Sequence, residues 1–338
     1  MNESTAHSAR RRKQSYWRLV GRQFRKRRLA MGGLGLLGFL LIIAIAAPFL
    51  AGDKPVHLVK DGVTYWLPNL IQHRDLLHFD FGAWQRGPGD WALYPPIPYA
   101  PERSDLVNRL QGPSRYHWLG TDDRGRDVLS RMVWGTRISI SIGFVAVGIS
   151  VLIGMILGAL AGYYGGVVDV LILRTIEVMM CVPVFFLIIA LIAFLPPSIY
   201  NIMVVIGITG WTGVARLVRG EFLKLRESDF ATAARATGLR DARVMFRHLL
   251  PNALAPVLVS ATFGVAGAIL TESALSFLGF GVPPPTASWG EILSQSKRYL
   301  EFAWWLVTFP GLAIFVTVTA FNLVGEGLRD AMDPRLRQ

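Results

Sequence analysis

The sequence predicts an all-α polytopic membrane protein that crosses the bilayer several times. Of its 338 residues, 52% are hydrophobic and only 17% are charged, and the mean hydropathy is +0.40. The apolar residues are also clustered, since positions 139–168 contain no charged residue. A helix needs about 20 apolar residues to cross the hydrocarbon core, whereas a barrel strand needs about 10. Such long runs therefore favour helices, which satisfy their own backbone hydrogen bonds in lipid.

Six segments are long and apolar enough to span a membrane. They are Leu29–Ala51, Ile138–Tyr163, Val168–Leu195, Tyr200–Gly220, Pro251–Leu278 and Ala303–Gly325. The third contains Pro183, which predicts a kink because proline lacks the N–H that continues a helix. The second contains Gly154, Gly158 and Gly162 at four-residue spacing, which places them on one helix face. We expect this face to pack closely inside the bundle, and a dimer contact is the alternative.

The charges of the connecting segments predict that both termini lie in the cytoplasm. Residues 1–28 carry ten Lys or Arg and one Glu, and residues 216–248 carry eight basic and four acidic residues. Residues 52–137 carry eleven basic and ten acidic residues and show no positive bias. This segment is rich in tryptophan and proline, so we expect an ordered, mostly non-helical insert on the extracytoplasmic side, between the first two spans.

These predictions divide the chain into consecutive parts. They are a basic cytoplasmic tail (1–28), a first transmembrane helix (29–51), a periplasmic insert (52–137), a core of five transmembrane helices (138–327) and a second cytoplasmic tail (328–338).

Several chemical functions are excluded or disfavoured. The net charge of +12 does not indicate nucleic-acid binding, because residues 1–28 supply +9 of it beside the first span. No lysine follows a glycine, so the chain has no P-loop and we expect ATP to be hydrolysed elsewhere. Residues 122–127 lack the distal Glu of a calcium loop, and we expect them to cap a helix leading into the second span. No catalytic residue, metal ligand or cofactor bound by this chain is predicted.

The charged residues within the predicted spans include Arg174, Glu177 and Glu272. Arg174 and Glu177 are three positions apart on one helix face, which would allow them to pair, but we favour the interpretation that they snorkel toward the membrane surface. Glu272 lies inside the fifth span, where a charge without a partner costs roughly 2.5–3.5 kcal/mol. With Ser273 and Ser276 it is predicted to line a substrate pathway, and the alternative is a structural hydrogen bond to one of these serines or to a neighbouring helix.

A short polar segment, residues 229–238, separates the fourth and fifth spans on the predicted cytoplasmic side. Ser228 or Asp229 is suited to cap a helix that starts at Phe230, and the alanines that follow favour helix. Gly238 is suited to the left-handed conformation that ends it. A two-turn helix with small side chains fits into a groove of another protein. A plain amphipathic connector is the alternative.

This segment resembles the EAA loop of ABC-importer permeases, whose motif is E-A-A-x3-G-x9-I-x-L-P. The matching positions here are Thr232, Ala233, Ala234, Gly238, His248, Leu250 and Pro251. Thr232 replaces the motif's Glu and His248 replaces its Ile, so a carboxylate at position 232 is not required by the resemblance. The family uses this loop as the helix that docks into the ATPase. The resemblance assigns coupling to six residues here: Asp229, Phe230, Ala233, Ala234, Arg235 and Gly238.

Longer strings extend the resemblance to the dipeptide/oligopeptide branch of these permeases, C-type subunit. They cover residues 118–131, 162–169, 275–281 and 327–334. The insert, including Lys60-Asp-Gly-Val-Thr-Tyr-Trp66, is most similar to that of the Yej permeases of oligopeptide and microcin C import. The resemblance implies a type I ABC importer fold and alternating access in the bacterial inner membrane. It also implies a second permease subunit, two ATPase subunits or one fused ATPase that bind ATP and Mg, and a periplasmic peptide-binding protein.

Two other functions remain open at this level. A secondary transporter or channel would need no docking helix, and ion dependence without ATP would reveal it. An ABC permease of the same branch for another cargo, such as nickel, an oligosaccharide, an opine or an antimicrobial peptide, would share the core motifs. The binding protein chiefly sets the cargo, and fold kinship alone does not.

Overall fold

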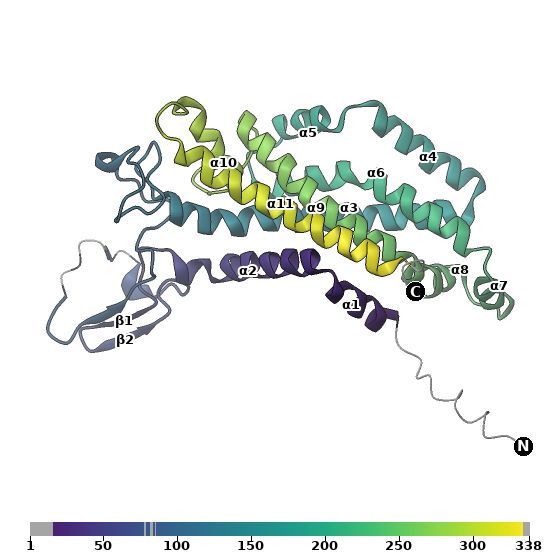
Figure 1. The fold of residues 1–338 in the computed structure, drawn as a ribbon, viewed down its shortest axis with the longest axis horizontal. Helices are drawn as coiled ribbons and strands as arrows, with labels where there is room; N and C mark the ends of the chain where they lie inside the picture. The colour runs from purple at the N-terminus through teal and green to yellow at the C-terminus, as the bar shows by residue number, and fades with distance from the viewer. Residues whose placement is uncertain (1–15, 78, 82–83, 85, 334–338) are drawn as a thin grey trace, which may run out of the picture.

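The structure, a computed structural model, describes residues 16–77, 79–81, 84 and 86–333. Among these residues, five helical segments are long and apolar enough to cross a membrane, and a bent pair of helices is a sixth candidate. The five contain α2 (Arg28–Leu50), α3 (Val128–Tyr164), α6 (Ile199–Leu225), α9 (Leu250–Leu278) and α11 (Trp305–Met332). They run along the long axis of the molecule (Figure 1).

The bent pair is the predicted third span. It consists of α4 (Gly166–Cys181) and α5 (Val184–Ala193), whose axes differ by 83°. Pro183 lies between them, as predicted, but the helix breaks there instead of only kinking. The physical reason is that a residue before proline avoids the helical conformation, and Val182 is extended with φ −98° and ψ 126°.

Two spans are longer than the apolar runs predict. The second begins at Val128, ten residues before Ile138, because the Asp127 carboxylate accepts a hydrogen bond of 2.7 Å from the Ser130 amide and caps the helix. The helix that Asp127 caps is thus the second span itself, and not a separate helix leading into it. The last span continues to Met332, past the predicted end at Gly325. A helix can continue beyond the hydrocarbon core, so hydropathy alone predicts both helices to be shorter than they are.

The predicted glycine face forms the contact between α3 and α6. A Cβ atom built on Gly154 would lie 2.6 Å from Val214 Cβ, one on Gly158 would lie 2.5 Å from the Ala215 carbonyl oxygen, and one on Gly162 would lie 2.5 Å from Phe222 Cβ. Three successive helical turns therefore have no room for a side chain. The interpretation as packing inside the bundle is confirmed, and the glycines are not free to form a dimer face.

The segment between α2 and α3 is mostly non-helical. It holds a three-stranded antiparallel sheet of order β2-β1-β3, made of β1 (His57–Lys60), β2 (Val63–Trp66) and β3 (Trp91–Leu93). Two 3-10 turns, Arg74–Leu76 and Leu106–Asn108, follow in the connections. The last ten residues of the predicted insert, 128–137, belong to α3 instead.

The predicted N-terminal tail contains a helix that the apolar pattern did not indicate. In α1 (Tyr16–Lys26), Val20 is buried against Ala331 and Met332 of α11. Arg27 follows and pairs with Asp330 at 3.1 Å. Residues 1–15 of this tail and residues 334–338 of the C-terminal tail lie outside the described residues.

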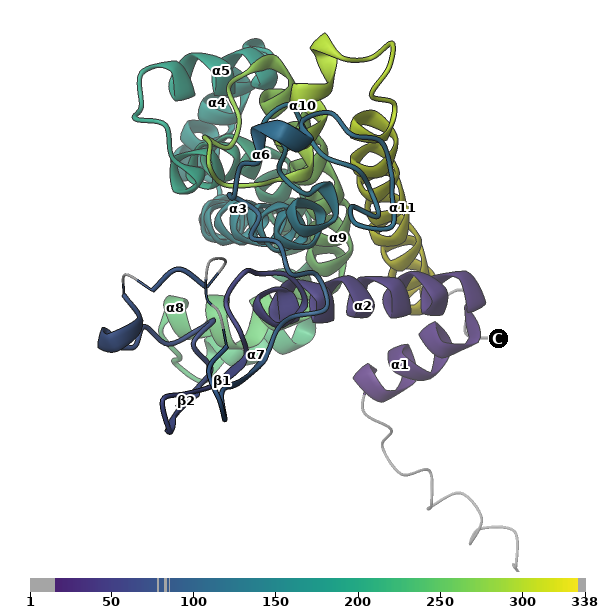
Figure 2. The same cartoon turned by 90° about the vertical axis from the view of Figure 1, so that its left-hand side faces the viewer.

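The helices leave two distinct ends on the molecule (Figure 1). One end, called the α7 end, carries α1, the last turn of α11, α7 (Asp229–Ala236) and α8 (Asp241–Arg243). The opposite end, called the sheet end, carries the β-strands and α10 (Trp289–Gln295), which a 3-10 turn (Ser296–Arg298) follows. A π-helical turn (Val244–Leu249) joins α8 to α9. Figure 2 shows α4 and α5 on the flank away from α2 and α11.

Candidate functional site

The helix α7 forms where the polar segment predicts it, with a different start. It begins at Asp229, one residue before Phe230. The Ser228 hydroxyl donates to the Leu225 carbonyl at 2.5 Å, so it does not accept an amide as a side-chain cap. At the other end Gly238 has φ +75°, and its amide donates to the Arg235 carbonyl at 2.9 Å. The left-handed glycine after α7 agrees with the prediction.

The inner face of α7 packs on the bundle through small side chains. Ala231 is 1% exposed and belongs to an apolar cluster with Phe222 of α6 and Met245 of the π-helical turn. Ala234 packs against the same cluster. Because only methyl groups face inward, α7 sits close to the bundle end, and a larger side chain at 231 would push it away.

Polar contacts also fix the segment to the ends of α3 and α6. Arg235 donates from Nη2 to the Arg226 carbonyl at 2.6 Å, and Arg226 donates from Nη1 to the Gly162 carbonyl at 3.3 Å. The Tyr163 hydroxyl donates to Asp241 Oδ1 at 2.7 Å. The segment is therefore tied to the end of α3 through Arg226 and Tyr163, and α7 is tied to the end of α6 through Arg235.

The outer face of α7 is open. Asp229, Phe230, Ala233 and Arg235 are exposed, and the Phe230 side chain is 43% exposed. Phe246, in the π-helical turn, is 44% exposed at the same end. All six predicted coupling residues thus lie on one short helix and its end, with Ala234 turned inward. The exposed side chains of α7 therefore offer a contact surface.

Glu272 is fully buried on α9. It accepts hydrogen bonds at Oε1 from the hydroxyls of Ser276 at 2.7 Å and Ser288 at 2.8 Å. Ser273, which was predicted to stand beside it, donates instead to the Ile269 carbonyl at 2.8 Å. In this conformation Glu272 therefore has the contacts of the structural alternative. It joins α9 to the residue that caps α10.

A cavity of about 560 Å³ lies directly in front of Ser276 at the sheet end; we call it the α9–α10 cavity. Its walls come from the end of α9, the loop that follows, α10 with its 3-10 turn, and Asp123 and Pro197 from two other connections. Ser276 belongs to the wall, while Glu272 and Ser273 lie behind it. Of the three residues predicted to line a substrate pathway, Ser276 lines the α9–α10 cavity, and Glu272 and Ser273 do not.

A buried ion network behind this cavity was not predicted. Arg126 Nε contacts Asp122 Oδ2 at 2.7 Å, Arg131 Nε lies 3.5 Å from the same oxygen, and Arg131 Nη2 pairs with Glu291 of α10. Burial raises the pKa of the Glu291 carboxyl, and the Arg131 charge opposes this shift. Residues 122–127 do cap a helix, but they also supply this network. No spacing pattern relates positions 131 and 291, so sequence periodicity had no signal for the pair.

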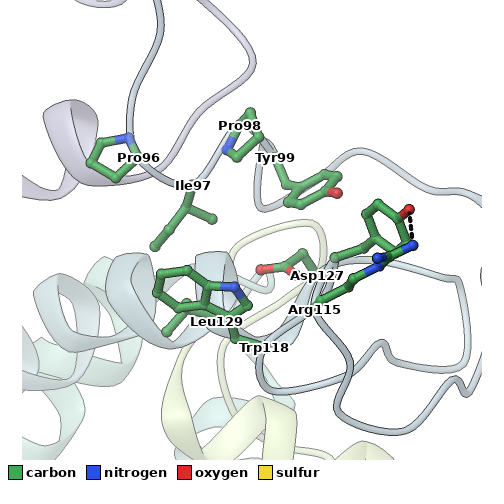
Figure 3. Close-up of a pocket in the computed structure, with 9 residues that line it drawn as sticks. Pro96, Ile97, Pro98, Tyr99, Arg115, Trp118, Asp127 and Leu129 are labelled. Atoms are coloured by element: carbon green, nitrogen blue, oxygen red, sulfur yellow. Dashed lines mark hydrogen bonds between the residues drawn. The ribbon is translucent and has the colours of Figure 1, made fainter.

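A second cavity, of about 280 Å³, lies beside the start of α3 (Figure 3). Tyr99, Arg115 and Asp127 lie around it in the close-up, with Trp118 below. Asp127 Oδ2 is 2.9 Å from His117 Nδ1. Burial raises the pKa of the Asp127 carboxyl, and the hydrogen bonds from the Ser130 amide and His117 oppose that rise. The Asp127 carboxylate thus caps α3 through Oδ1 and contacts the loop residue His117 through Oδ2.

On α4 the pairing of Arg174 with Glu177 is observed, which was the alternative to the favoured snorkelling. Arg174 Nη1 donates to Glu177 Oε2 at 2.6 Å, and both side chains are exposed. A second pair, Arg219 with Asp169, joins α6 to α4 through two bonds of 2.5 and 2.6 Å. The bent pair of helices is therefore held to the bundle near the α7 end.

Comparison with known proteins gives the family. The family described as "Binding-protein-dependent transport system inner membrane component" matches residues 154–338, and "N-terminal TM domain of oligopeptide transport permease C" matches residues 15–63. The chain is 38% identical over 323 residues to a dipeptide transport system permease of Alkalihalophilus pseudofirmus, covering 96% of this chain and 91% of the relative. It is 34% identical over 337 residues to an oligopeptide transport system permease of Bacillus subtilis, covering 100% and 95%.

Two further similarities cover a smaller share of this chain. A glutathione transport system permease of Pectobacterium atrosepticum is 42% identical over 248 residues, covering 73% of this chain and 82% of the relative. An inward-facing methionine ABC transporter, MetNI, has a TM-score of 0.49 at 18% identity, covering 60% of this chain and 95% of that one.

The apolar helices and the matched family together define a polytopic permease with the transmembrane-domain fold of a type I ABC importer. The chain belongs to the binding-protein-dependent transport permeases, among the C-type subunits of dipeptide and oligopeptide transporters.

Proposed function

We propose that α7 is the coupling helix of this peptide permease and that it docks into a separate ATPase. The observation that carries the proposal is its geometry: a two-turn helix with exposed Phe230 and small neighbours, fixed to the ends of α3 and α6. A rigid contact of this kind transmits motion of a soluble partner to the transmembrane helices. The complete importer would contain a second permease subunit, two ATPase subunits or one fused ATPase that bind ATP and Mg, and a periplasmic peptide-binding protein.

The proposed orientation puts the α7 end in the cytoplasm and the sheet end outside. The positive bias of residues 216–248 and the location of α1 and the end of α11 beside α7 support it. Both termini are then cytoplasmic. Peptide would enter at the sheet end, pass Ser276, Glu272 and Ser273, and leave near α7 by alternating access.

For the cargo we propose oligopeptides, including microcin C-like peptides. The names of the dipeptide and oligopeptide relatives support the general class, and the likeness of the insert to the Yej permeases supports the finer one. Another relative is named for glutathione transport, so similar chains are named for different small peptides. The peptide library used below should therefore contain glutathione and microcin C.

The test is ATP hydrolysis by the complex that co-purifies through a tag on this chain, with and without the binding protein and peptides. We expect an ATPase to co-purify and peptides to stimulate it. Phe230→Asp should remove the ATPase from the complex, because it places a charge on the docking face. Val107→Asp is the matched control, since Val107 is 89% exposed in the segment at the sheet end. Retention of the ATPase by Phe230→Asp would rule out α7 as the docking helix.

A further inference from the structure

The α9–α10 cavity has the size and position of a ligand site. Its volume of about 560 Å³ falls within the range of roughly 300–1,000 Å³ for small-molecule sites. It lies at the sheet end, where the proposed orientation places the outer mouth of the permease. Gly281 keeps the loop after α9 pressed onto the helix, because a Cβ there would lie 1.8 Å from the Ser276 hydroxyl oxygen. The cavity wall is therefore built by close packing.

Two hydrogen-bond acceptors of the lining residues are buried and lack a partner. They are Asp123 Oδ1 and Gln295 Oε1. A buried polar atom without a hydrogen bond costs about 1–3 kcal/mol, so such atoms call for an explanation when they meet at one cavity. Both are oxygens, and no donor of the described residues reaches either of them.

The orientation of Gln295 follows from its neighbour. The Glu291 carboxylate accepts a hydrogen bond from Gln295 Nε2, and a carboxylate can only accept, so the amide nitrogen must face it. Glu291 is in turn held by Arg131 in the buried network. The network thus fixes the orientation of the Gln295 amide. Its oxygen, Oε1, has no partner and is available to accept a hydrogen bond from a ligand.

Two positively charged side chains line the exposed part of the same cavity. Lys297 and Arg298 are exposed lining residues, and neither forms an ion pair with a carboxylate in the part of the chain that the structure describes. The Lys297 ammonium lies 4.2 Å from the centroid of the Phe277 ring, which positions it without neutralising it. Unpartnered acceptors and free cations thus line the same cavity, and such a lining is complementary to a molecule with an ammonium group and a carboxylate.

We infer that the α9–α10 cavity binds a short peptide, with its N-terminal ammonium group donating to Asp123 and Gln295 and its carboxylate facing Lys297 and Arg298. This inference rests on the proposed function and adds a substrate site within this chain, separate from the binding protein. The ammonium group supplies three donors, which suits two acceptors that no protein group reaches. The site would receive the peptide as it enters the permease.

The test is the affinity of the complete transporter complex, in lipid nanodiscs without its binding protein, for trialanine and its blocked forms, measured by calorimetry. Trialanine is expected to bind at least about tenfold more tightly than N-acetyl-trialanine, because acetylation removes the ammonium group. Asp123→Asn should weaken the binding of trialanine and leave that of the acetylated peptide unchanged. Lys297→Gln/Arg298→Gln should remove the preference for trialanine over its C-terminal amide.

Arg115→Gln is the matched control, because Arg115 is a cation at the same end that lines the other cavity. Equal affinity for free and acetylated trialanine on the unmodified complex would overturn the inference without any variant, and so would the absence of binding. These results are separable from the proposed function. If peptides stimulate the ATPase through the binding protein but the complex binds free and acetylated trialanine equally, the proposed site is wrong and the proposed function stands.

Discussion

The backbone of Gly238 decides how α7 ends. Its φ of +75° suits glycine, and no atom lies within 4 Å of a Cβ built there, so a substitution acts through conformation and not through a clash. Gly238→Val should cost about 1–2 kcal/mol locally and displace the end of α7. We expect peptide uptake by reconstituted transporter to fall several-fold relative to ATP hydrolysis.

Gly238→Asn provides the control, because asparagine accepts the left-handed conformation and adds a side chain of similar size. It should keep uptake and hydrolysis coupled. If Val and Asn variants behave alike, the conformation of residue 238 is not what couples the two activities.

The environment of Glu272 gives a second test at the scale of one residue. A glutamine keeps an oxygen that accepts from Ser276 and Ser288, whereas alanine leaves both buried hydroxyls without their acceptor, at about 1–3 kcal/mol. We expect Glu272→Gln to keep the uptake rate and the preference between cationic and anionic peptides, and Glu272→Ala to lower the thermal unfolding midpoint. A changed preference in the glutamine variant would show that the carboxylate charge meets the substrate in another conformation.

Among the helices, the tightest contact is the glycine face between α3 and α6. Gly158→Leu forces a side chain against the Ala215 backbone and Val218, so we expect a loss of about 1–3 kcal/mol and aggregation of the solubilised permease. Gly148→Leu changes the same helix where nothing lies within 4 Å of the added Cβ. It should remain monodisperse in size-exclusion chromatography, and equal damage by both variants would contradict the packing argument.

The sequence could predict elements whose signals are local. Apolar runs located the spans, and Pro183 located the break between α4 and α5, since proline acts on its own helix. Hydropathy missed the first ten residues of α3, because their stability comes from the Asp127 cap and from tertiary contacts. It also missed α1, whose buried side chains meet α11 far along the chain.

At the scale of the whole molecule, the site was harder to predict than the fold. The coupling residues are contiguous, so a motif found them together on α7. The α9–α10 cavity instead combines Asp123, Ser276 and Gln295, which come from three distant parts of the chain. Glu272 could be identified from the sequence as a charge in an apolar run. Its contact with Ser288 could not be predicted, because it depends on how the loop after α9 folds back.

The last prediction concerns the buried ion network that joins α3 to α10. Arg131, on the first turns of α3, is 0% exposed and contacts both Asp122 and Glu291. Removing one partner leaves buried charges without compensation and typically costs about 3–5 kcal/mol. Arg131→Met should therefore lower the thermal unfolding midpoint of the complex strongly. Arg131→Met/Glu291→Leu removes one charge of each sign and keeps the Asp122–Arg126 pair.

The double variant should consequently be more stable than Arg131→Met alone, although it carries two changes. Such a recovery follows only if the damage in the single variant is electrostatic, because lost packing would make the second change add to the first. A double variant less stable than the single one would mean that Arg131 joins α3 to α10 chiefly by filling space. The recovery would instead show that balanced charge holds α10, and with it the wall of the α9–α10 cavity, against α3.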